Sequence, residues 1–126
     1  MPHSFSVAGS PPVVIARVDG RVDLIYLQWV LYECVCQGRH KDIRRFLIDF
    51  KHSRLDLADV DVYPDARYIA SELPAGARVS AVVEAPDASL QRFADSLAEA
   101  GDVFMRILSS EEKAAEWLYQ DAQNAA

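Results

Sequence analysis

The sequence predicts an α/β fold in which a mostly parallel sheet of four or five strands is flanked by about four helices. Short apolar segments rich in β-branched residues alternate with segments of helical periodicity. The connections between them are short, which favours right-handed crossovers between parallel strands. The strand segments are apolar along nearly their whole length, as expected when helices cover both faces of a sheet.

Four segments have the composition of strands in such a sheet. Each is a short apolar run bounded by glycine, proline or charged residues. These segments are Val13–Val18, Arg45–Phe50, Arg78–Glu84 and Val103–Leu108. Phe5–Val7 predicts a short additional strand inside an N-terminal arm, residues 1–10. The polar stretch Lys51–Asp59 indicates an irregular connection.

Each strand is followed by apolar residues at helical spacing. The expected helices run from Leu24 to about Gln37, from Val62 to Leu73, from Asp87 to the residue before Gly101, and from Ser109 to about Tyr119. Asp23 is placed to cap the first helix and Gly38 to end it, and Ser109–Glu112 has a capping-box pattern. Residues 121–126 are expected to form a frayed tail. No repeat or linker interrupts residues 1–126, which predicts a single domain.

The composition is that of an ordinary globular domain. Of 126 residues, 51% are hydrophobic and 25% are charged, and the formal net charge is −6. This charge opposes non-specific binding to nucleic acid or anionic membrane. No run approaches the roughly 20 apolar residues that span a bilayer, and the first residues lack a signal-peptide pattern. We therefore expect a cytoplasmic protein without a membrane span.

The residue types that most often bind metals or cofactors show no useful spacing. His3, His40 and His52 form no metal-binding pattern with each other or with the cysteines. Cys34 and Cys36 lie two apart on a predicted helix and point to nearly opposite sides, so we expect two reduced thiols. The five glycines form no phosphate-binding loop. The sequence thus predicts no metal site and no cofactor.

Two carboxylates, Asp19 and Asp49, occur at predicted strand ends, where open α/β sheets place their ligands. They could form a divalent-cation pocket like that of a phosphoacceptor receiver domain. Such a site also needs a lysine and a hydroxyl residue at later strand ends, and Glu84 and Ser109 do not supply that pair in the expected order. The favoured interpretation is that the acids cap loops and helix starts.

His52 completes a candidate polar site with Asp19 and Asp49. Asp49, His52 and Ser53 have the residue types of a hydrolase triad, but triads are assembled from separate segments. No G-x-S-x-G elbow surrounds Ser53. A small hydrolase is therefore the least favoured function, no catalytic residue is assigned, and His52 is expected to be a loop residue bonded to backbone.

The first predicted helix carries two apolar stripes. The core stripe consists of Leu24, Leu27, Leu31, Cys34 and Val35. The second stripe, at steps of four, three and four, consists of Ile25, Trp29, Tyr32 and Cys36. At about 100° per residue the stripes lie on separate faces, so the second must meet a neighbouring helix, an apolar ligand or another chain. Trp117 and Leu118 in the last helix are candidates for an internal cover.

Three stretches carry a family resemblance. VVIARVDGRVD has a strand followed by a Gly-x-hydrophobic-Asp turn, Gly20 to Asp23. FLIDFKHSRLD has a central strand ending in Asp and a loop to a second Asp, and EAGDVFMRILSSEEKAAEWL has a last strand leading into a helix that starts Ser-x-Glu-Glu. In order and spacing, from about Val13 to Leu118, they resemble the STAS domains of bacterial anti-sigma factor antagonists, in the divergent SpoIIAA-like branch.

The resemblance implies a scaffold that binds proteins or small apolar or anionic molecules. Phosphoregulated STAS domains have Ser or Thr after the second Asp, usually as Asp-Ser/Thr-x-Gly, whereas this chain has Asp56-Leu57-Ala58. The kinase-controlled switch is therefore not carried over. The divergent branch is also likened to CRAL-TRIO lipid-transfer folds, which is an analogy of fold and not of site.

These observations favour a non-enzymatic regulatory or protein-interaction module, whose partner is another protein or a second copy of the chain. The alternative is a carrier or sensor of a small apolar ligand, held between the sheet and the helices. An enzyme that uses Asp49 and His52 is the third hypothesis.

Overall fold

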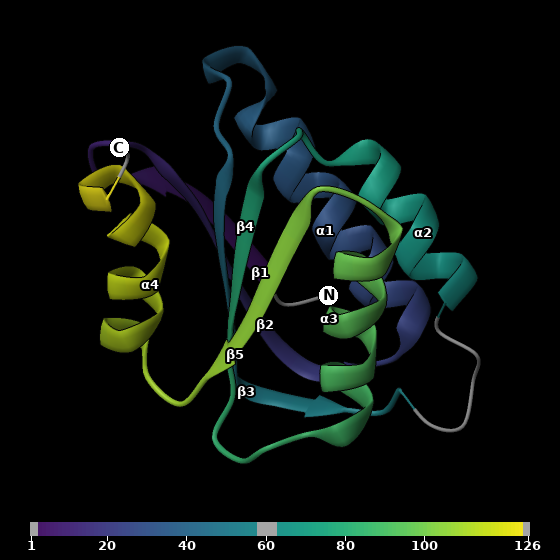
Figure 1. The fold of residues 1–126 in the computed structure, drawn as a ribbon. Coiled ribbons are helices and arrows are strands. Elements are labelled where there is room, and N and C mark those ends of the chain that lie inside the picture. The colour runs from purple at the N-terminus through teal and green to yellow at the C-terminus, as the bar shows by residue number, and fades with distance from the viewer. Residues whose placement is uncertain (1–2, 58–62, 125–126) are drawn as a thin grey trace.

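The computed structural model describes residues 3–57 and 63–124, which form one five-stranded sheet and its helices (Figure 1). The elements are β1 (His3–Ala8), β2 (Val13–Val22), α1 (Leu24–Gly38), the 3-10 turn η1 (Arg39–Lys41), β3 (Arg45–Leu55), α2 (Tyr63–Glu72), β4 (Ala77–Val82), α3 (Ala88–Ala100), β5 (Val103–Leu108) and α4 (Glu111–Asn124). The strand order is β1-β2-β3-β4-β5. β1 is antiparallel to β2 and the other pairs are parallel, so the predicted α/β class is confirmed.

The helices form two layers of unequal size. Figure 1 shows α1, α2 and α3 on one face of the sheet and α4 alone on the other. Successive crossovers of one hand between neighbouring parallel strands leave their helices on the same face. α4 lies across the opposite face, where it packs on β3, β4 and β5.

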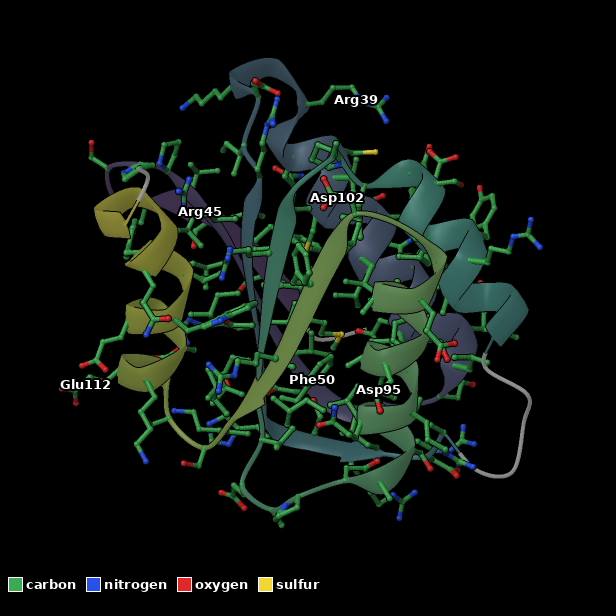
Figure 2. The ribbon with its side chains drawn as sticks, in the orientation of Figure 1. Arg39, Arg45, Phe50, Asp95, Asp102 and Glu112 are labelled. Atoms are coloured by element: carbon green, nitrogen blue, oxygen red, sulfur yellow. The ribbon has the colours of Figure 1, made fainter. Side chains whose placement is uncertain are left out.

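Alternation along β3 divides the apolar side chains between two cores. Phe46, Ile48 and Phe50 belong to the large core beneath α1, α2 and α3. Leu47 faces the other way, into a smaller core that includes Trp117 and Leu118 of α4. Figure 2 shows Phe50 inside the molecule and Arg45 between the sheet and α4, where its Nε donates to the Leu118 carbonyl oxygen at 2.9 Å.

Side-chain caps begin three of the helices. The Asp23 carboxylate accepts from the Tyr26 amide at 2.8 Å, as predicted, and Asp87 accepts from the Leu90 amide at 2.8 Å. In the last helix the cap is Ser110, whose hydroxyl accepts from the Lys113 amide at 3.2 Å, one residue later than the sequence pattern indicated. The caps thus begin each of these helices within a residue or so of the predicted start.

The first helix ends at Gly38, as predicted, but not through a left-handed glycine. Gly38 is the last residue of α1 and has a φ of −94°, while the left-handed residue is Asp42, with φ 53°. A Cβ on Gly38 would lie 3.0 Å from the Ile43 Cβ and 3.2 Å from the Val14 Cγ2. Glycine is needed there because β2 and the chain after η1 approach the helix closely.

The irregular connection predicted at 51–59 is also wrong in its first half, because β3 continues to Leu55. β2 runs on beside it, and the pairing shifts from Arg17–Asp49 to Asp19–His52, so β3 has one extra residue at this point. The β-bulge could not be predicted from the sequence of β3 because it depends on how β3 pairs with β2. Residues 58–59 and Val62 of the predicted elements lie outside the described residues.

Two further boundaries differ from the prediction. α4 continues to Asn124, beyond the expected end near Tyr119, so residues 121–124 are helical and not a frayed tail. β1 spans His3–Ala8 and confirms the short strand predicted at residues 5–7. α4 also contacts the hairpin between β1 and β2, where the Tyr119 hydroxyl donates to the Pro11 carbonyl oxygen at 2.9 Å.

Candidate functional site

The outer face of α1 is the first candidate surface. The core stripe of the helix is buried along its whole length, as predicted. On the other stripe, Ile25 is 78% exposed, Trp29 41% and Tyr32 39%, while Cys36 is half-buried. The Trp29 ring lies 5.9 Å from that of the buried Tyr26, which holds it against the helix. We call Ile25, Trp29, Tyr32 and Cys36 the α1 face.

The internal cover considered from the sequence does not reach this face. Trp117 and Leu118 pack under α4, on the opposite side of the sheet. Within α1, Glu33 is the one ionisable acid or base apart from the thiols and phenols, and the charges of Arg39 and Glu72 on neighbouring elements also act on Tyr32. The Cys36 thiol raises the pKa of the Tyr32 phenol through its charge and a hydrogen bond. Apolar and aromatic groups therefore dominate the outer side of this helix.

A polar cleft of about 530 Å³ is the second candidate, and it brings together Asp19, Asp49 and His52. Asp49 is 5% exposed, and its Oδ2 accepts from the Arg17 guanidinium at 3.0 Å. Arg17 also donates to Glu111 at the start of α4. The hydrogen bond that Arg17 donates to Glu111 raises the pKa of Arg17; burial acts in the opposite direction, and the charge of Glu111 and the contact with Asp49 add to the increase. The Arg17 side chain thus ties the sheet to α4.

The contacts in this cleft explain why these residues are not a triad. The second Asp49 oxygen accepts from the Lys51 amide at 2.9 Å, and the Ser53 hydroxyl donates to the Val18 carbonyl oxygen at 2.7 Å. Both bonds satisfy backbone groups freed by the β-bulge. His52 lies in β3 and is exposed, so the loop placement predicted for it is wrong, and among the described residues no hydrogen bond joins it to Asp19 or Asp49.

The remaining titratable groups offer no second polar site. Within residues 3–57 and 63–124, no cluster of three or more His, Cys, Asp or Glu side chains could hold a metal ion. Cys34 and Cys36 are both free thiols, and burial raises the pKa of Cys34 far above its usual range. None of the helices in the described part of the chain is long and apolar enough to cross a membrane.

A crevice of about 580 Å³ at the carboxyl ends of β4 and β5 is the third candidate, and the sequence interpretation missed it. The chain leaves β4 toward one face of the sheet and leaves β5 toward the other, which opens a gap between the two connections. Glu84 and Ser109 line it; the sequence interpretation had rejected both as metal partners and had also assigned Ser109 to a helix cap. The tendency of ligands to bind at the carboxyl ends of strands could have pointed to this crevice. The local sequence, however, does not show which face of the sheet α4 covers.

Comparison with known proteins supports the fold and no more. No family model matches this chain, and no curated protein matches it significantly. A solved structure that matches is described as an uncharacterized protein from the DUF3478 family with a SpoIIAA-like fold, from Shewanella loihica PV-4. The two chains are 16% identical over 92% of this chain and 93% of that one, with a TM-score of 0.52. The predicted STAS resemblance is thus confirmed at the level of architecture: this chain has a SpoIIAA-like fold.

Proposed function

We propose that this chain is a non-enzymatic regulatory module of the cytoplasm that works by binding a protein through the α1 face. The occupant to which we commit is a second copy of the chain. The observation that carries the proposal is the contrast between the two sides of α1. Its core stripe already anchors the helix to the sheet, and three large apolar side chains remain on the outside.

The composition of the α1 face suits a protein contact. Aromatic residues are enriched and charged residues depleted at the centres of protein interfaces. Tyr and Trp each bury roughly 150–250 Å² when covered, which makes them effective anchors. Ile25, with 78% of its surface in water, gains most from such a cover.

The net charge of the chain opposes self-association, but it does so least at the α1 face. Each chain has a formal net charge of −6, so two copies repel each other at most orientations. A symmetric contact is least opposed where the facing surfaces carry few charges, and the α1 face is such a surface. The regulatory part of the proposal rests on analogy with other SpoIIAA-like folds, which is an argument from fold alone.

Sedimentation of the wild type and two substituted chains tests the proposal. Ile25→Glu should weaken self-association by roughly tenfold or more, because a carboxylate would be desolvated in the interface. Thermal melting should stay close to wild type, because Ile25 makes little contact within the chain. Trp29→Asp should act in the same direction at some cost in stability, since part of its ring is packed.

Phe104→Glu is the matched control. Phe104 is 47% exposed and lies on β5, the edge strand opposite β1. This substitution also replaces a large apolar side chain with a carboxylate. It should leave the association constant unchanged. A wild type that stays monomeric at every concentration, or equal effects of Ile25→Glu and Phe104→Glu, would contradict the proposal.

A further inference from the structure

The four residues of the α1 face are spaced symmetrically along the helix. Ile25, Trp29, Tyr32 and Cys36 follow one another at steps of four, three and four residues, and the same steps occur in both directions. The midpoint of this stripe lies between Trp29 and Tyr32, close to the middle of α1 (Leu24–Gly38). A twofold axis through the midpoint therefore brings every residue of the stripe opposite another residue of the stripe in a second copy.

Two orientations of the second copy are compatible with a twofold axis, and they bring different side chains together. When the two α1 helices are antiparallel, Trp29 lies opposite the partner's Tyr32, and Ile25 lies opposite the partner's Cys36. When the helices are parallel, each side chain lies opposite its own copy. Aromatic rings can pack in offset or edge-to-face geometry in either case, so the apolar groups alone do not select the orientation.

The charges at the carboxyl end of α1 favour the antiparallel orientation. Arg39 follows Cys36 by three residues and has helical backbone angles, so it continues the stripe beyond the helix. It is exposed, and its charge and that of Glu72 both act on the Tyr32 phenol. A parallel contact would bring Arg39, Lys41 and Glu72 each toward its own copy, where like charges repel. An antiparallel contact keeps them at opposite ends of the interface, and it also opposes the two helix dipoles.

We propose that two copies of the chain associate with their α1 helices antiparallel, so that Trp29 of each chain packs on the partner's Tyr32. This inference rests on the proposed function and adds to it the residues that meet across the interface. The outer ends of the stripe are covered as well, because Ile25 of each chain meets the partner's Cys36. Such a contact is isologous and closed, so association ends at the dimer.

A short bifunctional maleimide distinguishes the two orientations. Cys36 is the reactive thiol of the wild type, because Cys34 is buried. In the antiparallel dimer the two copies of Cys36 lie about 16 Å apart along the helices, so the wild type should give no covalent dimer. Ile25→Cys places a thiol opposite the partner's Cys36, and the reagent should then join the two chains. Positions 25 and 36 of one chain are also about 16 Å apart, so a short link between them is intermolecular.

The double variant Ile25→Cys, Cys36→Ser is the matched control, since it keeps the new thiol and removes its counterpart; it should give no covalent dimer. Each reaction is run at a concentration where sedimentation shows that variant to be dimeric, and mass spectrometry of the peptides identifies the linked positions. A link between the two copies of Cys36 in the wild type, or no link between positions 25 and 36 in dimeric Ile25→Cys, would overturn the antiparallel orientation and leave the proposed function standing. A wild type that stays monomeric would remove both.

Discussion

Asp49 illustrates how a polar residue at a strand end can be structural and not catalytic. Its two oxygens are occupied by the Arg17 guanidinium and the Lys51 amide, and both partners are held by the sheet. The carboxylate therefore completes the β-bulge of β3 and links it, through Arg17, to Glu111 in α4. Each oxygen of this carboxylate thus already has a partner within the fold.

Removing this carboxylate should cost about 2–3 kcal/mol of unfolding free energy, because the Lys51 amide and one Arg17 contact lose their partner. Urea denaturation of Asp49→Ala measures the change. Asp95→Ala is the control: its carboxylate is on the surface of α3 and accepts only from Gln91, so we expect a loss below about 0.5 kcal/mol. Equal losses in the two variants would show that Asp49 has no special structural role.

The two cysteines should differ sharply in reactivity although they are two residues apart. Burial raises the pKa of the Cys34 thiol, so the native state keeps this proton where an unfolded thiol, at about 8.5, ionises. The native state then binds more protons than the unfolded state, and the free energy of unfolding falls as pH rises above that value. Alkylation in mild alkali should modify only Cys36 in the native protein and both thiols in denaturant, as read by mass spectrometry. Native labelling of Cys34 at the rate of Cys36 would contradict this.

Among the elements, the segment after β3 separates this chain from the phosphoregulated STAS pattern. In the sequence resemblance Leu57 is the counterpart of the acceptor hydroxyl, and in the structure it is 3% exposed and packed in the large core. The Asp56 amide donates to the Val22 carbonyl oxygen at 2.8 Å, which holds the segment to the end of β2. A hydroxyl introduced here would be turned inward, away from any kinase.

Incubation with a STAS-directed kinase should therefore add no phosphate near Asp56. Intact-mass measurement followed by peptide mapping checks this, with a phosphorylatable STAS domain as positive control. Ser53 is the nearest hydroxyl, and it is half-buried and bonded to the Val18 carbonyl oxygen. A phosphopeptide containing Ser53 would mean that this part of β3 opens in solution.

The elements that could be predicted are those specified by local pattern. Alternation and apolar runs located all four parallel strands, and the predicted Asp23 cap located the start of α1 to the residue. The extension of β3 could not be predicted, because its polar residues are stabilised by pairing with β2 and by side chains across the β-bulge. Asp19, Asp49 and His52 of the polar cleft were named in advance, but Arg17 was not. The crevice was not, because it depends on which face of the sheet α4 covers.

For the whole molecule, the net charge of −6 should govern association. Two copies that meet through the α1 face still repel each other through the rest of their surfaces, and added salt screens that repulsion. Sedimentation at low and high ionic strength should therefore show tighter self-association in salt. Ile25→Glu should remain monomeric under both conditions. Association that weakens with salt would indicate a contact made by ion pairs elsewhere on the surface.

The strand order of the sheet is also the order along the chain, and this has a consequence for folding kinetics. Each parallel pair joins segments separated by a single helix, so the loops that must close are short and their closure entropy is small. The sheet can grow by adding one neighbouring strand and helix at a time, without waiting for the two ends of the chain to meet. In stopped-flow experiments the main refolding phase should fall within milliseconds, earlier than for an all-β chain of this length. α4 packs across several strands of the sheet, so we expect it to dock last, after the strands have paired.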